Sequence, residues 1–493
     1  MSNPTAYQSL VDHQRDIALL GSTQAVLGWD QETQMPNDAV AHRAAQLGQL
    51  TRLTHQMQTD PRIGDWLDAA GNGDTDADQA CNISYWRKSW DRATRMPEDL
   101  AVALSEASSV AMASWQQARA TDSFPEFAPH LETLVGLKRR EAEAMGWPAG
   151  GEAWDALADE FDPGMTAASV SAVFTPLRSA LVDLRASVPE QTTTDIGALK
   201  GLPVDQQTRF LKGLVARMGF SFDGGVMATS THPFCTSLGA GDVRMTMRSD
   251  EDTLLTALGS SMHECGHALY EQGLPRNFAG QPRGAYNGLS IHESQSRLWE
   301  NHVGRSKPFW EWFTGQIADE FALPGLDAEQ LYRAVNRTEA GLIRVEADQA
   351  TYDLHIMVRF ELERALLNGD LKPSELPDAW NAHYRDYLGV TPDSNATGCL
   401  QDIHWSMGAM GYFPTYTLGN LYAAQFFDAA RAALPALETQ IASGDFAPLL
   451  AWLRTEIHDP GRLHSPSELC ERVTGKALSA GPMLAHLGRL HGV

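Results

Sequence analysis

Apolar residues recur every three or four positions along most of the chain, which is the spacing of amphipathic helices. Residues 7–28 show this pattern before a break at Met35 and Pro36. Alanine-rich stretches with the same spacing predict further helices over residues 98–119, 128–145, 166–187 and 421–443. Polar stretches at 71–79 and 186–197 predict loops that are too short to link separate domains. The pattern therefore predicts a mainly α-helical protein.

One region, residues 224–248, is poor in helix-forming residues. Within it Val243, Met245 and Met247 alternate with polar residues, which is the period of a strand with one buried face. The LGAG sequence at 238–241 comes just before and supplies a turn. We therefore expect a small hairpin or short sheet here.

The segment that follows has the punctuation of a single helix. Ser249 or Asp250 can cap its N-terminus, and Gly273 with Pro275 marks its end. An apolar stripe along it consists of Leu255, Leu258, Met262, Cys265 and Leu269.

This helix contains the sequence H-E-x-x-H. His263 and His267 are four residues apart, so both imidazoles can reach one ion from a face outside the apolar stripe. Glu264 can reach a water on that ion without binding the metal. The alternative is a chance pattern in a surface helix, but the capping signals and the position of the histidines favour a metal site.

A hydrolytic zinc site needs a third protein ligand and an open position for water. The metzincin continuation is excluded because Tyr270 and Gly273 occupy the places of its glycine and histidine. Glu293 is the favoured third ligand, although its alternative role is a capping box with Ser290. The rival ligands are Glu271, His292 and Glu300.

Composition narrows the function classes. The chain has 38 Lys and Arg against 62 Asp and Glu, a net charge of −24 over 493 residues. Such a surface repels phosphate backbones and anionic lipid, so we expect no nucleic-acid or membrane partner. Five scattered cysteines without a CxxC pair, and an N-terminus without an apolar export segment, predict a cytoplasmic protein.

Several short motifs follow one another in a fixed order. They are LGWDQETQMP at 27–36, HPF at 232–234, DVRMT at 242–246, HECGH at 263–267, HESQ at 292–295, IRVEAD at 343–348, GCLQDIHW at 398–405 and GYFPTYTLGN at 411–420. In this set and order the chain resembles the thermostable carboxypeptidase family, also called the carboxypeptidase Taq family of metallocarboxypeptidases.

The resemblance implies a mainly α-helical, neurolysin-like peptidase fold with a deep groove and a small β-sheet near the metal. It implies one catalytic domain over residues 1–493, with 1–220 forming one wall of the groove and 221–493 carrying the motifs. It also implies a homodimer, release of single C-terminal residues from peptides, and Zn²⁺ or Co²⁺ held by His263, His267 and Glu293. Cys265 departs from the bulky apolar residue expected there, and we interpret it as a small packing residue that could confer sensitivity to oxidants.

The remaining motif residues are candidates for catalysis and for substrate binding. Glu264 is the expected general base. A fixed guanidinium suits a terminal carboxylate, and Arg344 is preferred over Arg244, each with an internal salt bridge as the alternative: Arg344 with Glu346 or Asp348, and Arg244 with Asp242. Similarity to related helical peptidases makes His404, Tyr412 and Tyr416 the candidate donors to the developing oxyanion.

Three further roles are hypotheses of the same kind. His232 is a candidate substrate contact, with a structural role as its alternative. Asp348 and Asp402 are candidates for orienting the ligand or donor histidines. The DVRMT strand is a candidate to pair with the substrate backbone.

Two other functions compete with carboxypeptidase activity. A neurolysin-like zinc endo-oligopeptidase would share the metal motif, and hydrolysis of amidated peptides would identify it. A catalytically silent, zinc-containing helical binding protein is the other class. Structural zinc sites close the fourth position with Cys or His, and Cys265 lies on the wrong helix face for this.

Overall fold

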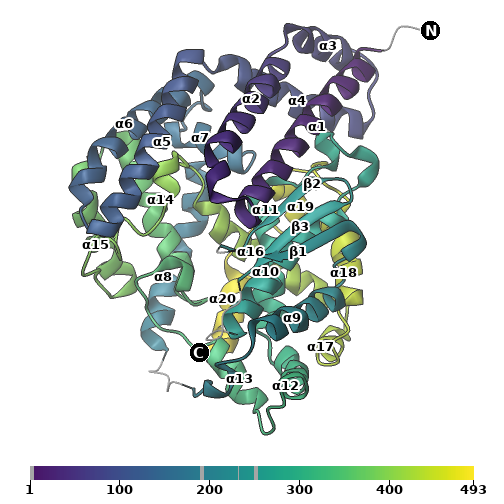
Figure 1. Ribbon diagram of the computed structural model, residues 1–493, viewed down its shortest axis with the longest axis vertical. Coiled ribbons are helices and arrows are strands. Elements are labelled where there is room, and N and C mark those ends of the chain that lie inside the picture. Colours follow the sequence, from purple (N-terminus) through teal and green to yellow (C-terminus); the bar gives the residue numbers. More distant parts are fainter. Residues whose placement is uncertain (1–4, 189–193, 231, 249–253, 493) are drawn as a thin grey trace.

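The computed structural model describes residues 5–188, 194–230, 232–248 and 254–492. The chain is mainly helical, as predicted, and Figure 1 shows its arrangement. The α-helices are α1 (Ala6–Thr33), α2 (Val40–Gln58), α3 (Pro61–Gly71), α4 (Ala77–Arg95), α5 (Glu98–Thr121), α6 (Phe124–Met145), α7 (Ala153–Phe161), α8 (Ala167–Ser187), α9 (Val204–Met218), α10 (Leu254–Gly273), α11 (Gly288–Arg297), α12 (Lys307–Phe321), α13 (Ala328–Val335), α14 (Tyr352–Asn368), α15 (Leu376–Leu388), α16 (Pro414–Ala433), α17 (Leu437–Ile441), α18 (Ala447–Leu453), α19 (Pro466–Thr474) and α20 (Gly481–His491). No helix in the described ranges is long and apolar enough to span a bilayer.

Short helical turns connect several of these elements. The 3-10 turns are η1 (Asn37–Ala39), η2 (Gly197–Leu199), η3 (Phe222–Gly224), η4 (Arg276–Phe278), η5 (Pro282–Gly284), η7 (Arg344–Glu346), η8 (Pro373–Glu375) and η9 (His404–Met407). Two π-helical segments, η6 (Leu298–Gly304) and η10 (Arg454–His458), continue α11 and α18 directly.

The sheet lies where the alternating pattern placed it. Its strands are β1 (Gly225–Thr229), β2 (Cys235–Gly239) and β3 (Asp242–Met247), in the spatial order β1-β3-β2. β2 and β3 form the predicted hairpin, and β1 pairs with β3 in parallel. Val243, Met245 and Met247 are buried, as predicted. β3 packs on α10 and so connects the sheet to the helix that carries the H-E-x-x-H sequence.

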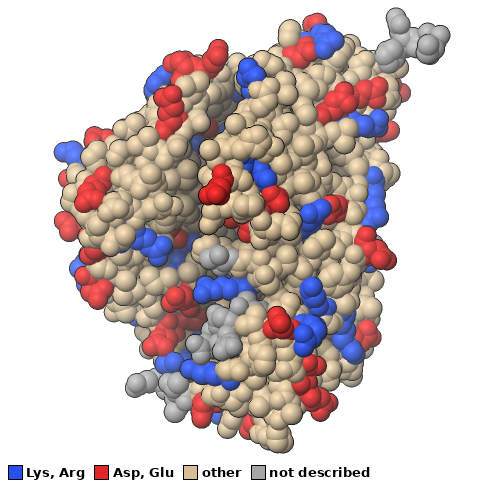
Figure 2. All heavy atoms as spheres, in the orientation of Figure 1, with Lys and Arg blue, Asp and Glu red and all other residues tan. Residues whose placement is uncertain are grey.

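Two hydrophobic cores hold the helices together. The larger core extends from Ala111 on α5 to Leu487 on α20. A smaller core joins α1, α3 and α4 through residues such as Leu10, Ile63 and Trp86. Figure 1 shows α5, α6, α14 and α15 on one side and the sheet with α9, α12 and α18 on the other. The surface between these two sides is hollowed in Figure 2.

The predicted helices agree with the structure except at one place. The stretch 421–443 is interrupted, because α16 ends at Ala433 and the separate helix α17 begins at Leu437. Leu434 there has φ −123° and ψ 80°, outside the helical region. The proposed caps Ser249 and Asp250 lie outside the described residues. The division into one domain with an N-terminal wall stays a prediction, as does the likeness to neurolysin.

Candidate metal centre

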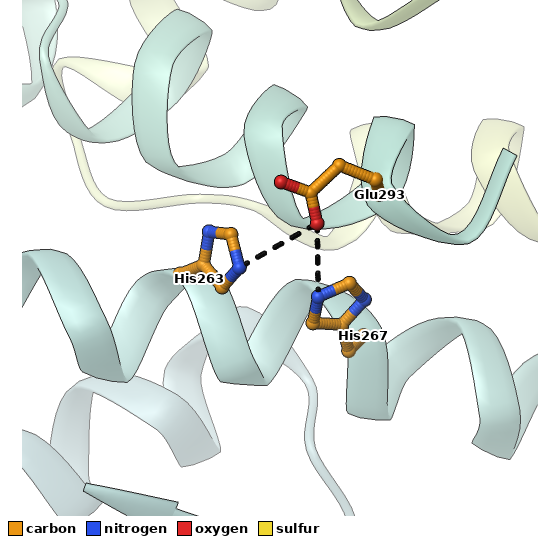
Figure 3. Close-up of side chains that lie close together, drawn as sticks. All are labelled: His263, His267 and Glu293. Carbon is orange, nitrogen blue, oxygen red and sulfur yellow. Dashed lines mark ion pairs between the residues drawn. The ribbon is translucent and has the colours of Figure 1, made fainter. Parts of the chain in front are cut away.

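Three side chains from two helices converge on one point. His263 and His267 lie one turn apart on α10, and Glu293 reaches across from α11 (Figure 3). The Oε2 atom of Glu293 lies 3.7 Å from His263 Nε2 and 3.3 Å from His267 Nε2. Among the described residues these three form the one group of three or more His, Cys, Asp or Glu residues whose ligand atoms all lie within 4.8 Å of each other.

This donor set fits a metal ion. Ligand atoms about 2.0–2.1 Å from a tetrahedral zinc ion lie about 3.4 Å from one another. The distances around Glu293 Oε2 are close to that value. Burial lowers the pKa of His267 to about 3, so its imidazole is neutral, as a metal ligand must be. Two imidazole nitrogens and a carboxylate oxygen leave the fourth position open to water.

Close packing of three helices sets the position of Glu293. α11 lies between α10 and α16. A Cβ atom on Gly266, inside the H-E-x-x-H motif, would lie 2.5 Å from the backbone oxygen of Gln295. A Cβ atom on Gly419 of α16 would lie 2.6 Å from Cγ of Glu293. Both glycines are therefore required for the helices to approach this closely.

Glu293 is a helical residue and not a cap. α11 begins at Gly288 with Asn287 as its N-cap, so Ser290 lies inside the helix and the capping-box alternative is wrong. Arg297 Nε donates to Glu293 Oε1 at 2.7 Å, and Ser296 Oγ donates to Oε2 at 3.1 Å. Arg297 thus holds one carboxylate oxygen and leaves the other directed at the histidines.

The rival ligands lie one layer further out. Glu300, on the π-helical segment η6, places Oε2 2.9 Å from His263 Nδ1, and its Oε1 accepts from Arg305 at 3.0 Å. His292 Nδ1 lies 2.6 Å from His267 Nδ1. Glu271 Oε1 lies 2.9 Å from His292 Nε2. Glu300 and His292 thus contact the nitrogens of His263 and His267 that face away from Glu293, and Glu271 contacts His292.

Glu264 lies beside the ligands without joining them. It is buried, and it lines the same cavity as His263, His267 and Glu293. Burial raises the pKa of Glu264 to about 7, opposed by the neighbouring His263. A carboxylate with a pKa near neutrality suits a general base that must later give up its proton.

The metal site opens into a cavity of about 1250 Å³. The described residues that line it lie between Pro233 and Tyr416 in the sequence. Apolar side chains such as Leu258, Met262 and Trp310 line it together with charged groups. The volume is sufficient for the end of a peptide.

Arg344 lines this cavity from η7 and is 6 % exposed. Its partner is neither Glu346 nor Asp348, the two salt bridges considered from sequence. Its Nη2 lies 2.8 Å from Asp402 Oδ1, and its Nη1 donates to the hydroxyl of Tyr352 at 3.1 Å. Asp402 also pairs with Arg359 at 2.6 Å, so it holds arginines and does not bond a histidine. Asp348 accepts from the backbone and hydroxyl of Thr351.

The candidate oxyanion donors cluster near Arg344. Tyr412 and Tyr416 both line the cavity, and their rings are 5.3 Å apart. His404 Nε2 lies 3.3 Å from the hydroxyl of Tyr416, and burial lowers the pKa of His404 to about 4. Neutral His404 is therefore the form next to Tyr416 at neutral pH. Arg344 lies 5.1 Å from the Tyr416 ring.

A buried carboxylate fixes the two segments that carry these donors. Glu363 on α14 accepts from Trp405 Nε1 at 2.8 Å and from the backbone N–H of Gly411. It also accepts from Trp154 Nε1 on α7 at 2.7 Å. One side chain thus connects the segments of His404 and Tyr412 to the rest of the helical core.

Arg244 and His232 lie outside the lining of this cavity. Arg244 pairs with Asp242 at 2.8 Å, the alternative considered from sequence, and lies over the Trp29 ring. His232 is exposed. The hypothesis that β3 pairs with the substrate is wrong, because both edges of β3 are occupied by β1 and β2. The edge strand β2 lines the cavity instead.

Sequence reasoning missed Arg297, Tyr352 and Glu363. Arg297 follows Glu293 by four residues, so helical spacing could have indicated it. Glu363 carried no local signal, because its partners are distant in sequence. Tyr352 lies eight residues from Arg344, a separation longer than the three or four residues of helical side-chain pairs. Cys265 is fully buried, as the packing interpretation expected, and burial raises the pKa of its thiol, which favours the unreactive neutral form.

Comparisons with known proteins show the family to which the chain belongs. The family model described as carboxypeptidase Taq (M32) metallopeptidase matches residues 9–490. Thermostable carboxypeptidase 1 of Thermus thermophilus is 45 % identical over 501 residues, covering 99 % of this chain and 98 % of that protein. Carboxypeptidase 1 of Bacillus subtilis is 33 % identical over 471 residues, covering 94 % and 93 %.

Solved structures extend the likeness to the fold. The M32 carboxypeptidase from Deinococcus radiodurans R1 superposes with a TM-score of 0.94 at 40 % identity, covering 99 % of this chain and all (100 %) of that one. Trypanosoma cruzi metallocarboxypeptidase 1 gives 0.95 at 32 % identity, covering 99 % of each chain. The family resemblance drawn from the motifs is confirmed. The chain therefore belongs to the carboxypeptidase Taq (M32) metallopeptidases and is a metal-dependent carboxypeptidase.

Proposed function

We propose that this carboxypeptidase is a zinc enzyme that removes single residues from peptide C-termini with broad specificity. His263, His267 and Glu293 would hold the ion. The observation that carries the proposal is their convergence beside Glu264 in a cavity that also contains Arg344. Cobalt(II) also suits nitrogen and oxygen donors, so we propose it as a competent replacement.

Each residue has a distinct task in this proposal. When bound, zinc would lower the pKa of a water molecule and polarise the scissile carbonyl. Glu264 takes the proton of the attacking water and passes it to the leaving amine. Arg344 receives the substrate carboxylate, because Asp402 balances only one of the two buried arginines beside it. Tyr412 and Tyr416, with His404 behind Tyr416, donate to the oxygen that becomes negative.

Substitution of Glu264 tests its role as the general base. Glu264→Gln keeps the size of the side chain but removes its ability to accept a proton, so kcat should fall about 10²- to 10⁴-fold. Metal content, measured by elemental analysis, should equal that of the wild type. Wild-type activity in this variant would contradict the proposed base.

Product analysis on one peptide tests the exopeptidase role. Incubation of free-acid and C-terminally amidated forms should release a single residue from the free acid only, and a chelator should abolish this. Cleavage of the amidated form would instead favour an endo-oligopeptidase. No specific feature of the site supports that alternative or a silent binding protein.

We also propose that the enzyme is a homodimer in the cytoplasm, acts on peptides, and has no nucleic-acid or membrane partner. Support for the cytoplasm comes from the cysteines, all five of which are free. Support for the lack of anionic partners comes from the net charge of −24. Light scattering coupled to gel filtration tests the dimer directly, and a mass near 54 kDa would contradict it.

A further inference from the structure

The two metal histidines have unlike partners behind them. His263 Nδ1 faces the carboxylate of Glu300 directly. His267 Nδ1 faces another imidazole, that of His292, at 2.6 Å. His292 in turn places Nε2 2.9 Å from Glu271 Oε1. In Figure 3 both ligand rings direct Nε2 at Glu293, which leaves each Nδ1 for these outer contacts.

A metal ion bound at Nε2 of His267 would leave one arrangement of protons in the hydrogen bonds behind it. Its Nε2 must offer a lone pair to the ion, so the neutral ring carries its proton on Nδ1. That proton is donated to His292 Nδ1, which therefore accepts. His292 then carries its own proton on Nε2 and donates it to Glu271. Each donor in this series meets one acceptor, and the series ends at a carboxylate.

Packing keeps the intermediate ring in place. His292 packs against two aromatic rings, with centroids 5.4 Å away for Tyr270 and 5.0 Å away for Tyr286. The hydroxyl of Tyr270 accepts from the backbone N–H of Asn287, which is the N-cap of α11. Glu271 follows His267 by one helical turn on α10, so the same helix supplies both ends of the series.

We propose that His292 and Glu271 are positioning residues that hold His267 in the tautomer able to bind the metal, and thereby set metal affinity. The inference rests on the proposed ligand set. It adds that Glu271 acts through His292 and not as a ligand. The orientation of His263 does not depend on this series, because its partner Glu300 is held separately by Arg297 and Arg305.

A pair of substitutions at His292 separates hydrogen bonding from packing. His292→Asn retains an acceptor close to the place of Nδ1, whereas His292→Leu has similar bulk and no acceptor. Competition for Zn²⁺ with a chromophoric chelator should show a loss of affinity of about 10- to 100-fold for Leu. The loss for Asn should be several-fold smaller. Equal losses, or none, would overturn the proposal.

A second pair of substitutions, at Glu271, tests the last acceptor of the hydrogen-bond series without altering either imidazole. Glu271→Gln keeps an oxygen acceptor for His292, and Glu271→Leu does not. We expect weaker Zn²⁺ binding in the Leu variant than in the Gln variant. Identical affinities would contradict the proposed role of Glu271 and His292. This pair decides the question if the His292→Leu chain does not fold, which thermal unfolding of the metal-free proteins will show.

Controls distinguish this inference from the proposed function. His383 bonds the carbonyl of Ala379 and lies on α15, away from the metal, so His383→Leu should leave Zn²⁺ affinity unchanged. If the wild type binds no Zn²⁺, the proposed function fails. If the wild type binds Zn²⁺ tightly and the four variants bind it equally well, only the proposed role of His292 and Glu271 fails.

Discussion

The carboxylate of Asp402 holds two buried arginines at once. Its Oδ1 pairs with Arg344 and its Oδ2 with Arg359, whose side chain is fully buried (0 % exposed). One negative charge therefore offsets two positive charges next to the cavity. The excess positive charge is what a substrate carboxylate would neutralise.

Removing that carboxylate should destabilise the protein. Asp402→Asn leaves two buried guanidinium groups without a counter-charge, and we expect the free energy of unfolding to fall by about 3–5 kcal/mol at pH 7. Urea unfolding measures the change. The matched control is Asp386→Asn, which removes an exposed partner of Arg385 and should cost less than about 1 kcal/mol. Similar losses in both would contradict the argument.

The same contact predicts a pH dependence. Burial alone would raise the pKa of Asp402, but Arg359 and Arg344 hold it well below its usual range. Because the pKa is lower in the folded protein than the value of about 3.9 in the unfolded chain, the stabilisation is present above about pH 4 and is lost as the pH falls further. The difference between wild type and Asp402→Asn should therefore shrink below about pH 4.

Residue identities were predictable where the chemistry is local. The spacing of His263 and His267 on one helix was enough to indicate a ligand pair, because a helix fixes which side chains share a face. The partner of Arg344 was not predictable in this way. Asp402 lies in a different segment of the chain, and nearer acidic residues competed for the assignment.

At the scale of elements, contact between α10, α11 and α16 positions Glu293, the proposed third ligand. Gly419 has no side chain, and Glu293 occupies the space that a Cβ atom would need. Helix α16 thus sets the position of Glu293, although it contributes none of the three proposed ligands.

Adding one methyl group should displace that ligand. Gly419→Ala forces Cβ towards Cγ of Glu293, and a shift of about 1 Å at a reacting centre lowers kcat/KM about 100-fold. The kcat/KM value, measured by steady-state kinetics, and the affinity for Zn²⁺ should both fall. Gly136→Ala on α6 is the control, because nothing lies within 4 Å of its Cβ and helix propensity improves there. Wild-type kinetics in Gly419→Ala would contradict the packing argument.

Element types were predicted better than their ends and their neighbours. Periodicity located the helices and the hairpin because it depends on one buried face. It did not indicate the break after Ala433, the π-helical turn η6, or the central position of β3. These features depend on packing partners that are remote in sequence.

At the scale of the whole molecule, the acidic surface should influence which peptides arrive. Acidic and basic side chains are interspersed on the face shown in Figure 2, but the net charge is −24. At about 0.01 M salt the Debye length is about 30 Å, and at 0.15 M it is about 8 Å. Long-range repulsion is therefore strong only at low salt.

The kcat/KM values of charged peptides should therefore depend on the salt concentration. A peptide with several acidic residues upstream of its C-terminus should show a lower kcat/KM than a basic peptide of equal length and C-terminal residue at about 0.01 M salt. Raising the salt to about 0.15 M should narrow the difference. A neutral peptide serves as the reference, and a ratio independent of salt would exclude steering by net charge.

The proposed metal ligands and their outer partners all lie between His263 and Glu300, in one continuous stretch of chain. Arg344, Asp402 and the tyrosines come from much later segments. Closing a short loop costs less entropy than joining distant segments, and the cost rises by about 0.6 kcal/mol for each doubling of loop length. During folding, α10 and α11 can therefore meet before the substrate-binding segments assemble, and α16 then fixes the position of Glu293. Pulsed hydrogen exchange with Zn²⁺ should show α10 and α11 protected ahead of residues 344–416, and simultaneous protection would contradict this order.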